Sequence, residues 1–279
     1  MFTNIKITGV MTENNRHQPL RVLQITDPHL MADSAGELLG VRTRDSLDAV
    51  IAQARRDHAR PDLILATGDI AQDASEEAYR LFADRLKAFD CGSAWIAGNH
   101  DDAPVLNRVA AEMNAGSRHL VMGGWQFVLL DSSVAGKVYG EVSGSELAFL
   151  EKTLTDNPDL PALIALHHHP VDIDTQWMSA IGLRNRDEFW QILDRFPQVR
   201  TVLWGHIHQE YDEYRKGVRL LATPSTCIQF KAGSARFSVE ERAPGYRWFE
   251  MTPNGDFTTG VKRAEEFLYE LDINSTGYR

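Results

Sequence analysis

Short apolar runs that end in polar residues are the feature that most constrains how this chain folds. From residue 21 onward these runs alternate with stretches of helical periodicity. Six of the runs have the length and composition of buried strands: 21–26, 63–67, 94–97, 127–130, 163–166 and 201–204. Helices are expected after Thr43 and Ser75, and a third from Asn185, where Glu188 completes a capping box. Strands and helices in alternation predict an α/β fold built around a mainly parallel sheet.

The pattern of apolar and turn-forming residues changes after about residue 209. Helical periodicity ends, and turn sequences such as Lys216-Gly217 separate four expected strands: 218–222, 236–241, 246–251 and 257–261. This pattern predicts β-hairpins in the C-terminal third. We expect one compact domain over residues 21–265, with a flexible extension at 1–20 and a tail at 266–279.

The balance of charge and the cysteine content restrict the partners and the compartment. Lys and Arg number 29 and Asp and Glu number 39, so the net charge of −10 disfavours nucleic acid as a partner. No apolar run reaches the ~18 residues that span a bilayer, and the polar stretch 1–20 is unlike a secretory signal. Two distant cysteines, Cys91 and Cys227, fit a reducing compartment. We therefore expect a cytoplasmic protein, monomeric or homodimeric, without a membrane or nucleic-acid partner.

Five of the six predicted strands end in residues that bind metals well. These residues are carboxylates, one carboxamide and imidazoles: Asp27, His29, Asp69, Asn99, His167, His206 and His208. Binding sites in open α/β sheets lie beyond the carboxyl ends of the strands, so the side chains are expected to meet in one crevice. The pairs Asp27/His29 and His206/His208 are spaced i, i+2, and in extended backbone both members of such a pair point to the same side.

Seven ligands are too many for one ion with an open position, but they suit two divalent ions that share a carboxylate. Asp69 stands alone at the end of its strand and is the expected bridge. Oxygen and imidazole ligands without cysteine favour iron or manganese, with zinc and cobalt as alternatives. Such a pair of ions lowers the pKa of bound water and neutralises phosphoryl oxygens, which makes hydrolysis of an anionic phosphodiester the predicted reaction.

Taken together, these motifs resemble those of the calcineurin-like metallophosphoesterases. The series is Asp-x-His at 27–29, Gly-Asp at 68–69, Gly-Asn-His-Asp at 98–101, the histidine run at 167–169 and Gly-His-x-His at 205–208. The stretches 38–40, 68–73 and 223–230 are more narrowly similar to the bacterial class III 3′,5′-cyclic-AMP phosphodiesterases. The likeness covers about residues 21–265 and implies a four-layer α/β/β/α sandwich.

The resemblance implies a role for each residue of the series. Asp27, His29, Asp69 and His208 would hold the first ion, and Asp69, Asn99, His167 and His206 would hold the second. The residues implied to contact the substrate are His29, Asp69, Asn99, His100, His167 and His208. His100 and Asp69 are the implied catalytic residues, and His100 would stabilise the transition state or protonate the leaving ribose oxygen. Asp101 is expected to orient His100.

Several neighbouring residues have a plainer interpretation. His168 and His169 are expected to support the ligands or face the substrate, with a purely structural role as the alternative. Asp73 and Asp131 are interpreted as turn residues. The segment 171–184 contains Trp177, which we interpret as loop packing, with stacking on a nucleotide base as the alternative.

Three functions are consistent with these motifs. The leading hypothesis is a dimetal phosphodiesterase that converts 3′,5′-cyclic AMP to 5′-AMP. The second keeps the ions but gives them another phosphodiester or a phosphomonoester, such as a glycerophosphodiester or another nucleotide. The third is a binding scaffold without catalysis. Scaffolds of that kind normally lose ligands or the histidine after Asn99, and this chain has retained both.

Overall fold

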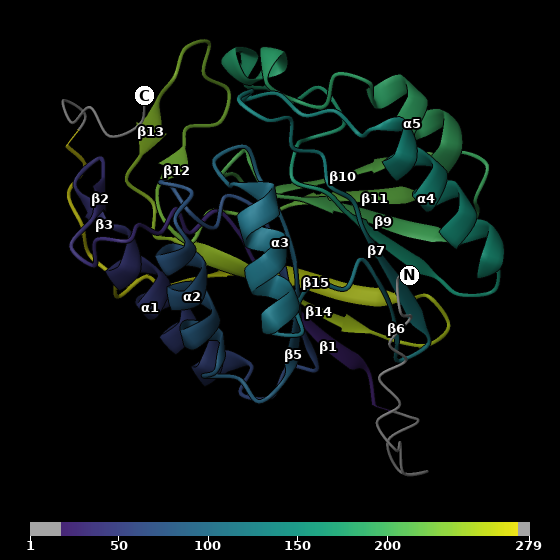
Figure 1. Cartoon of the computed structure of the whole chain (residues 1–279), viewed down its shortest axis with the longest axis horizontal. Helices are drawn as coiled ribbons and strands as arrows, with labels where there is room; N and C mark the ends of the chain where they lie inside the picture. Colours follow the sequence, from purple (N-terminus) through teal and green to yellow (C-terminus); the bar gives the residue numbers. More distant parts are fainter. Residues whose placement is uncertain (1–17, 273–279) are drawn as a thin grey trace.

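Two mixed β-sheets form the centre of the computed structural model, which describes residues 18–272 (Figure 1). The five-stranded sheet has the order β15 (Phe257–Arg263), β14 (Gly245–Met251), β1 (Leu20–Ile25), β4 (Leu63–Thr67) and β5 (Gly92–Ile96). The six-stranded sheet has the order β10 (Tyr211–Arg215), β11 (Val218–Ala222), β9 (Val199–Trp204), β8 (Ala162–Ala165), β7 (Trp125–Leu129) and β6 (His119–Met122). Two short ribbons pair β2 (Glu37–Leu38) with β3 (Val41–Arg42), and β12 (Gln229–Phe230) with β13 (Val239–Glu240).

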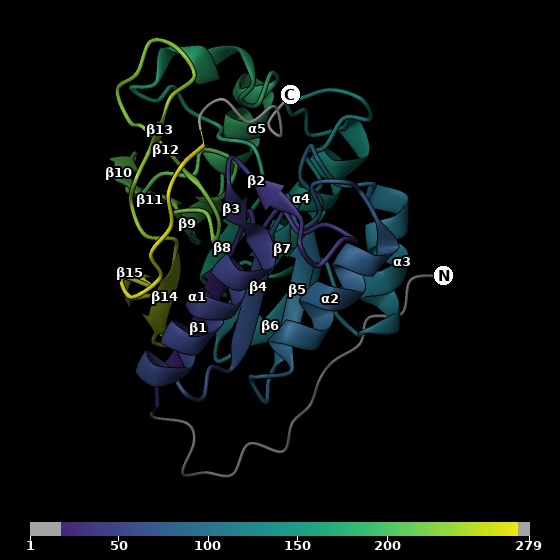
Figure 2. The same ribbon diagram turned by 90° about the vertical axis from the view of Figure 1, so that its left-hand side faces the viewer.

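The helices form two outer layers. On the five-stranded sheet lie α1 (Thr43–Asp57), α2 (Glu76–Leu86) and α3 (Ala103–Glu112), and their apolar residues share one core cluster with β1 and β4. On the six-stranded sheet lie α4 (Gly144–Asp156) and α5 (Arg186–Leu193), which share another cluster with β7, β8 and β9. Figure 1 shows the first group on the left and the second at the upper right, and Figure 2 shows α1, α2 and α3 side by side.

The two faces of each strand explain why the sheets stack. In β4, Ile64 packs toward the helices and Leu65 toward the other sheet, and in β8 Ile164 and Leu163 do the same. The inward residues of both sheets form a third core cluster between the layers. The four-layer α/β/β/α sandwich is therefore confirmed.

Three expectations about the elements need correction. The parallel strands are divided between two sheets instead of forming one: β1, β4 and β5 lie in the first, and β7, β8, β9 and β11 in the second. The expected C-terminal hairpins are confirmed as the antiparallel pairs β10–β11 and β14–β15. The strand expected at 236–241 is reduced to β13, which pairs with β12 rather than with a later hairpin strand. Helices α3 and α4 were not expected, although Asp102 and Ser143 cap them through their side chains.

The capping box at the start of α5 is also absent. Asn185 occupies the N-cap position, but its side chain makes no capping hydrogen bond. Its Oδ1 accepts from the backbone nitrogen of Val142, and its Nδ2 donates to the carbonyl of the same residue. The Asn185 side chain therefore joins two loops instead of capping the start of α5.

The limits of the domain can be described only in part. Residues 1–17 and 273–279 lie outside the described residues, while Leu20 already begins β1. Three residues of the expected tail, Phe267, Tyr269 and Leu271, pack against the main cores. The division at 21 and 265 remains a prediction. No helix among residues 18–272 has the length and apolar character needed to cross a membrane.

The inter-sheet core gives a prediction about stability. Leu65 is fully buried between the sheets, so Leu65→Ala should lower the free energy of unfolding by about 2–5 kcal/mol, measured by urea denaturation. Leu268 is 88% exposed, and Leu268→Ala should change it by less than about 0.5 kcal/mol. Equal effects of the two substitutions would contradict this account of the core.

Candidate metal centre

The residues that follow β1, β4, β5, β8 and β9 meet at one edge of the two stacked sheets. The backbone nitrogens of Asp27 and His29 donate to the carbonyls of Gly68 and Asp69, at 3.0 Å each, which joins the ends of β1 and β4. The backbone nitrogen of His206 donates to Asp27 Oδ1 at 3.0 Å, which joins the two sheets. The predicted crevice therefore has contributions from both layers.

Asp69 lies between two groups of imidazoles. Its Oδ2 is 3.8 Å from His29 Nε2 on one side and 3.3 Å from His167 Nε2 on the other. Its Oδ1 accepts a hydrogen bond from the backbone nitrogen of His100 at 2.9 Å. The Nε2 atom of His208 is 3.5 Å from Asp27 Oδ1.

These side chains form four overlapping groups in which the possible ligand atoms lie within 4.8 Å of one another. The groups are Asp27/His29/His208, Asp27/Asp69/His167, His29/Asp69/His100 and His167/His168/His206. All of these residues are buried except His100, which is partly exposed. The structure thus brings together every residue that the sequence predicted as a carboxylate or imidazole ligand.

Five of the predicted ligands have left-handed backbone conformations. Their φ angles are 52° for Asp27, 47° for His29, 49° for Asp69, 66° for His206 and 50° for His208. Such a conformation costs a non-glycine residue roughly 1–2 kcal/mol. Strain concentrated in this way is typical of functional sites. It also corrects the assumption of extended backbone, because the i, i+2 pairs lie beyond the ends of β1 and β9 and converge through turns.

Close approach of the loops requires glycine at two positions. A Cβ atom on Gly98 would collide with the carboxylate of Asp69. A Cβ atom on Gly205 would meet Thr26 Oγ1 and would lie 2.7 Å from Asp27 Oδ2. Each glycine therefore allows a neighbouring loop to pack directly on a carboxylate.

Each of four histidines has one ring nitrogen held by a protein acceptor. His29 Nδ1 contacts Gln72 Oε1 at 2.7 Å, and His167 Nδ1 contacts the carbonyl of Thr67 at 2.7 Å. The carbonyls of Ile181 and Ile228 are the corresponding partners of two further nitrogens, His206 Nε2 at 3.0 Å and His208 Nδ1 at 2.9 Å. Because a carbonyl can only accept, these contacts fix which ring nitrogen carries a hydrogen. The other nitrogen of each ring is the one that a cation could bind, as in metal sites.

Two observations show that the residues fit a cation. The Nε2 atoms of His29 and His208 are 3.1 Å apart, and with both Nδ1 atoms donating, two lone pairs face each other. Such lone pairs repel unless a proton or a cation lies between them. Asn99 Oδ1 is buried and accepts no hydrogen bond from any residue in the range 18–272. Buried polar atoms rarely lack a partner, so this oxygen also suits a cation.

The electrostatics favour the ligand forms of Asp69, His29 and His206. Burial opposes ionisation of Asp69, but His167 and other nearby imidazoles outweigh it and hold the pKa of Asp69 well below its usual range. Burial lowers the pKa of His29 to about 3 and that of His206 well below its usual value. It also disfavours the charged form of His167, but the Asp69 carboxylate outweighs this and raises the pKa of His167 to about 9. Asp69 therefore stays ionised at neutral pH, while His29 and His206 are neutral.

The structure assigns a supporting role to His168. Its Nε2 contacts the carbonyl of Val138 at 3.2 Å, and its Nδ1 contacts Ser132 Oγ at 2.8 Å. Both nitrogens are thus engaged, although the ring lies near His167 and His206. Nothing in the sequence pointed to Ser132, which also accepts from the backbone nitrogens of two of these histidines.

Asp101 does not orient the ring of His100 as expected. Its carboxylate accepts from the backbone nitrogens of Ile70, Ala71 and Gly98 at 2.8–3.2 Å. It therefore holds the loop after β4 against the loop after β5. The turn interpretation of Asp73 and Asp131 is confirmed, since each carboxylate accepts from the backbone nitrogen two residues later.

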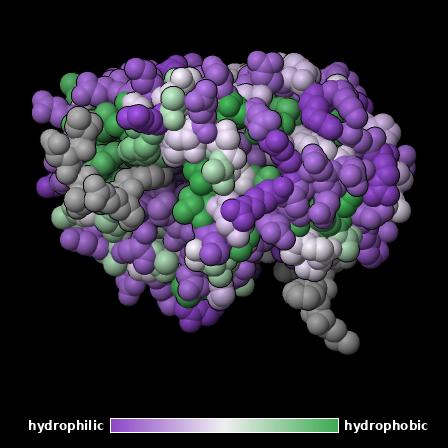
Figure 3. Space-filling view, turned by 90° about the horizontal axis from the view of Figure 1, so that it is seen from above, coloured by the Kyte–Doolittle hydropathy of each residue, from purple (hydrophilic) through white to green (hydrophobic). Residues whose placement is uncertain are grey.

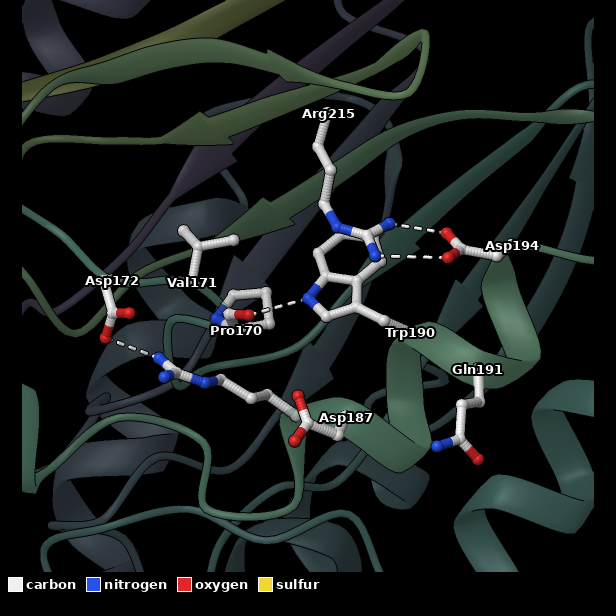
Figure 4. Close-up of a pocket in the computed structure, with 9 residues that line it drawn as sticks. Pro170, Val171, Asp172, Asp187, Trp190, Gln191, Asp194 and Arg215 are labelled. Atoms are coloured by element: carbon white, nitrogen blue, oxygen red, sulfur yellow. Dashed lines mark hydrogen bonds and ion pairs between the residues drawn. The ribbon is translucent and has the colours of Figure 1, made fainter.

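A hollow of about 480 Å³ lies beside α5, outside the cluster of ligands (Figure 4). Its two arginines, Arg186 and Arg215, are paired with Asp172 and Asp194, and Arg215 lies over the ring of Trp190 at 4.1 Å. The pairing leaves these cations little capacity for an anionic ligand.

Comparison with known proteins shows the same family over most of the chain. Residues 20–210 match the family model described as calcineurin-like phosphoesterase. The chain is 40% identical over 257 residues to a protein of Pseudomonas aeruginosa named 3′,5′-cyclic adenosine monophosphate phosphodiesterase CpdA, covering 92% of this chain and 94% of that protein. It is 42% identical over 261 residues to the protein of the same name from Escherichia coli K12, covering 93% and 95%.

A solved structure shows the same fold at much lower identity. A dimetal phosphatase from Danio rerio superposes with a TM-score of 0.65 at 17% identity, over 88% of this chain and 97% of that chain. The family model spans all five predicted strand ends, and the relatives and the solved structure each cover most of the chain. The chain belongs to the calcineurin-like phosphoesterase family.

Proposed function

We propose that this protein hydrolyses 3′,5′-cyclic AMP to 5′-AMP at a binuclear metal centre. The observation that carries the proposal is the placement of Asp69 Oδ2 between His29 Nε2 and His167 Nε2, at 3.8 and 3.3 Å. A carboxylate in that position suits two cations at once. The proposed substrate is supported by relatives at 40–42% identity that cover more than nine tenths of this chain and are named cyclic-AMP phosphodiesterases.

The ligands divide into two sets that share Asp69. Asp27, His29, Asp69 and His208 would hold one ion. Asp69, Asn99, His167 and His206 would hold the other, with His206 offering Nδ1 because its Nε2 is engaged by Ile181. Iron or manganese suits these oxygen and imidazole donors best, with zinc and cobalt as alternatives.

When bound, two divalent ions supply a hydroxide nucleophile at neutral pH and positive charge for the phosphoryl oxygens. The side chains of the protein act on the substrate itself. In the reaction a water oxygen joins phosphorus, the bond from phosphorus to the 3′ oxygen breaks, and that oxygen takes up a proton. His100 is the only partly exposed histidine of the cluster, and its ring lies 5.0 Å from that of His29. We assign it to the substrate phosphate and to protonation of the leaving oxygen.

The partners, oligomeric state and location of the protein are proposed on the same basis. A small cyclic nucleotide is the proposed substrate, and monomeric or homodimeric association and a cytoplasmic location remain predictions. The net charge of −10 continues to argue against nucleic acid as a partner.

A substrate panel tests the proposal directly. The metal-loaded protein should have a higher kcat/KM for cyclic AMP than for cyclic GMP, a glycerophosphodiester and a phosphomonoester, because pocket walls rather than ions select among phosphoesters. Elemental analysis of the same sample should find two ions per chain. A preference for one of the other substrates would replace cyclic AMP, and no turnover of any of them would support the binding scaffold.

Loss of one ligand should remove one ion. Asn99→Ala deletes the buried Oδ1, so we expect one ion to be lost from the second site and kcat/KM to fall by at least about 100-fold. Elemental analysis and turnover of cyclic AMP measure the two effects. Asn107→Ala, on the exposed side of α3, is the matched control and should change neither. Full metal content with unchanged turnover in Asn99→Ala would count against the ligand assignment.

Removal of the His100 side chain, the proposed general acid, should lower turnover without loss of metal. In His100→Ala the backbone nitrogen still donates to Asp69, so the metal content should stay at the wild-type value. The kcat for cyclic AMP should fall by about 10²–10⁴-fold, because proton transfer loses its side chain. Unchanged kcat would exclude His100 from the reaction, and loss of metal would give it a structural role instead.

A further inference from the structure

An aromatic cluster of three side chains lies beside His208. Phe230 stacks flat on the His208 ring, with centroids 4.1 Å apart and the planes within 1°. Phe237 contacts both Phe230 and Trp177, at centroid distances of 5.6 and 5.3 Å. Phe230 is fully buried, while Phe237 is 46% exposed. The cluster therefore extends from a proposed metal ligand to the surface.

The loop that carries Phe237 is fixed in place by its neighbours. It connects β12 to β13 and lies beside the 3₁₀ helix η2 (Gln176–Ala180) in both ribbon views (Figures 1 and 2). The backbone nitrogen of Gln176 donates to the carbonyl of Ser234 at 3.1 Å, and that of Gly233 donates to Thr175 Oγ1 at 3.3 Å. Thr175 in turn hydrogen-bonds to Gln209, the residue after His208. An aromatic side chain held in this way can bind a ligand at a low entropic cost.

Few aromatic rings are exposed among residues 18–272. Seen from above, the face that carries η2 and the β12–β13 loop is mostly hydrophilic (Figure 3). Over residues 18–272, the large apolar side chains with substantial exposure include two aromatic rings, Phe237 and Tyr214. Tyr214 belongs to the edge strand β10, whereas Phe237 is an exposed ring that is linked through Phe230 to the proposed ligand His208.

We propose that Phe237 is a stacking surface for the adenine base of the cyclic nucleotide, an inference that rests on the proposed function. In a 3′,5′-cyclic nucleotide only the ribose separates the phosphorus from the base. With the phosphate beside the ligand cluster, the base extends toward the exposed ring of Phe237, which the buried Phe230 connects to His208. A neutral aromatic face suits a purine, which stacks through its π surface, and offers nothing to a phosphate. Trp177 then has the packing role expected of it, since it contacts Phe237 edge to face.

The test compares two substrates that differ only in the base. Phe237→Ala should raise KM for cyclic AMP by about 5- to 150-fold with little change in kcat. It should leave kcat/KM unchanged for methyl riboside 3′,5′-cyclic phosphate, in which a methoxy group replaces the base. Phe237→Trp should keep the wild-type KM, whereas Phe237→Leu, which is apolar but has no π face, should resemble Phe237→Ala. Tyr214→Ala is the control for loss of an exposed ring and should behave as wild type.

The outcomes distinguish failure of the proposed function from failure of the stacking role of Phe237. Wild-type protein that does not hydrolyse cyclic AMP overturns the proposed function and this inference with it. Wild-type protein that hydrolyses cyclic AMP, together with an unchanged KM in Phe237→Ala, overturns the inference alone. It is equally overturned if Phe237→Leu matches wild type, or if Phe237→Ala impairs both substrates to the same extent, since the ring would then act through the structure of the site.

Discussion

The position of one buried carboxylate, that of Asp69, determines much of the surrounding structure. Oδ1 accepts from the backbone of the loop after β5, and Oδ2 faces imidazoles delivered by β1 and β8. An ionised carboxylate that is removed from water is stable only with compensating partners. Gly98 leaves room for this carboxylate, and Asp101 clamps the two loops on either side of it. These features are therefore consequences of the need to bury one negative charge at the junction of two sheets.

The ligand loops are strained, and the layered core tolerates that strain. Five left-handed residues at roughly 1–2 kcal/mol each oppose folding by an amount comparable to the net stability of a typical domain. Three apolar clusters of buried side chains provide the offset, one between the sheets and one under each layer of helices. Local strain that is balanced by packing elsewhere is typical of sites under functional selection. Cations placed among the ligands would relieve part of the repulsion between His29 and His208.

The sequence predicts those features of the fold and the site that depend on the type of side chain. Apolar runs predict strands β1, β4, β5, β7, β8 and β9, and helical periodicity predicts α1 and α2. The residues at the strand ends predict the convergence of Asp27, Asp69 and His167. The division into two sheets was not visible in periodicity, because a strand buried on both faces looks the same in either sheet. The partners of the histidine rings were missed for a different reason. Most are backbone carbonyls, such as those of Thr67 and Ile228, and every residue type offers a carbonyl.

The contact between Ile181 and His206 links the segment 171–184 to the ligand loop after β9. The segment 171–184 carries Trp177 near its middle and Ile181 a few residues later, and the carbonyl of Ile181 holds the ring of His206. Gly182, the next residue, packs so closely on His169 that even a methyl group would collide with it. An insertion or deletion in this segment during evolution would displace the Ile181 carbonyl and also the residues around Trp177. Divergence toward new substrates is therefore expected to proceed by exchange of side chains at constant loop length.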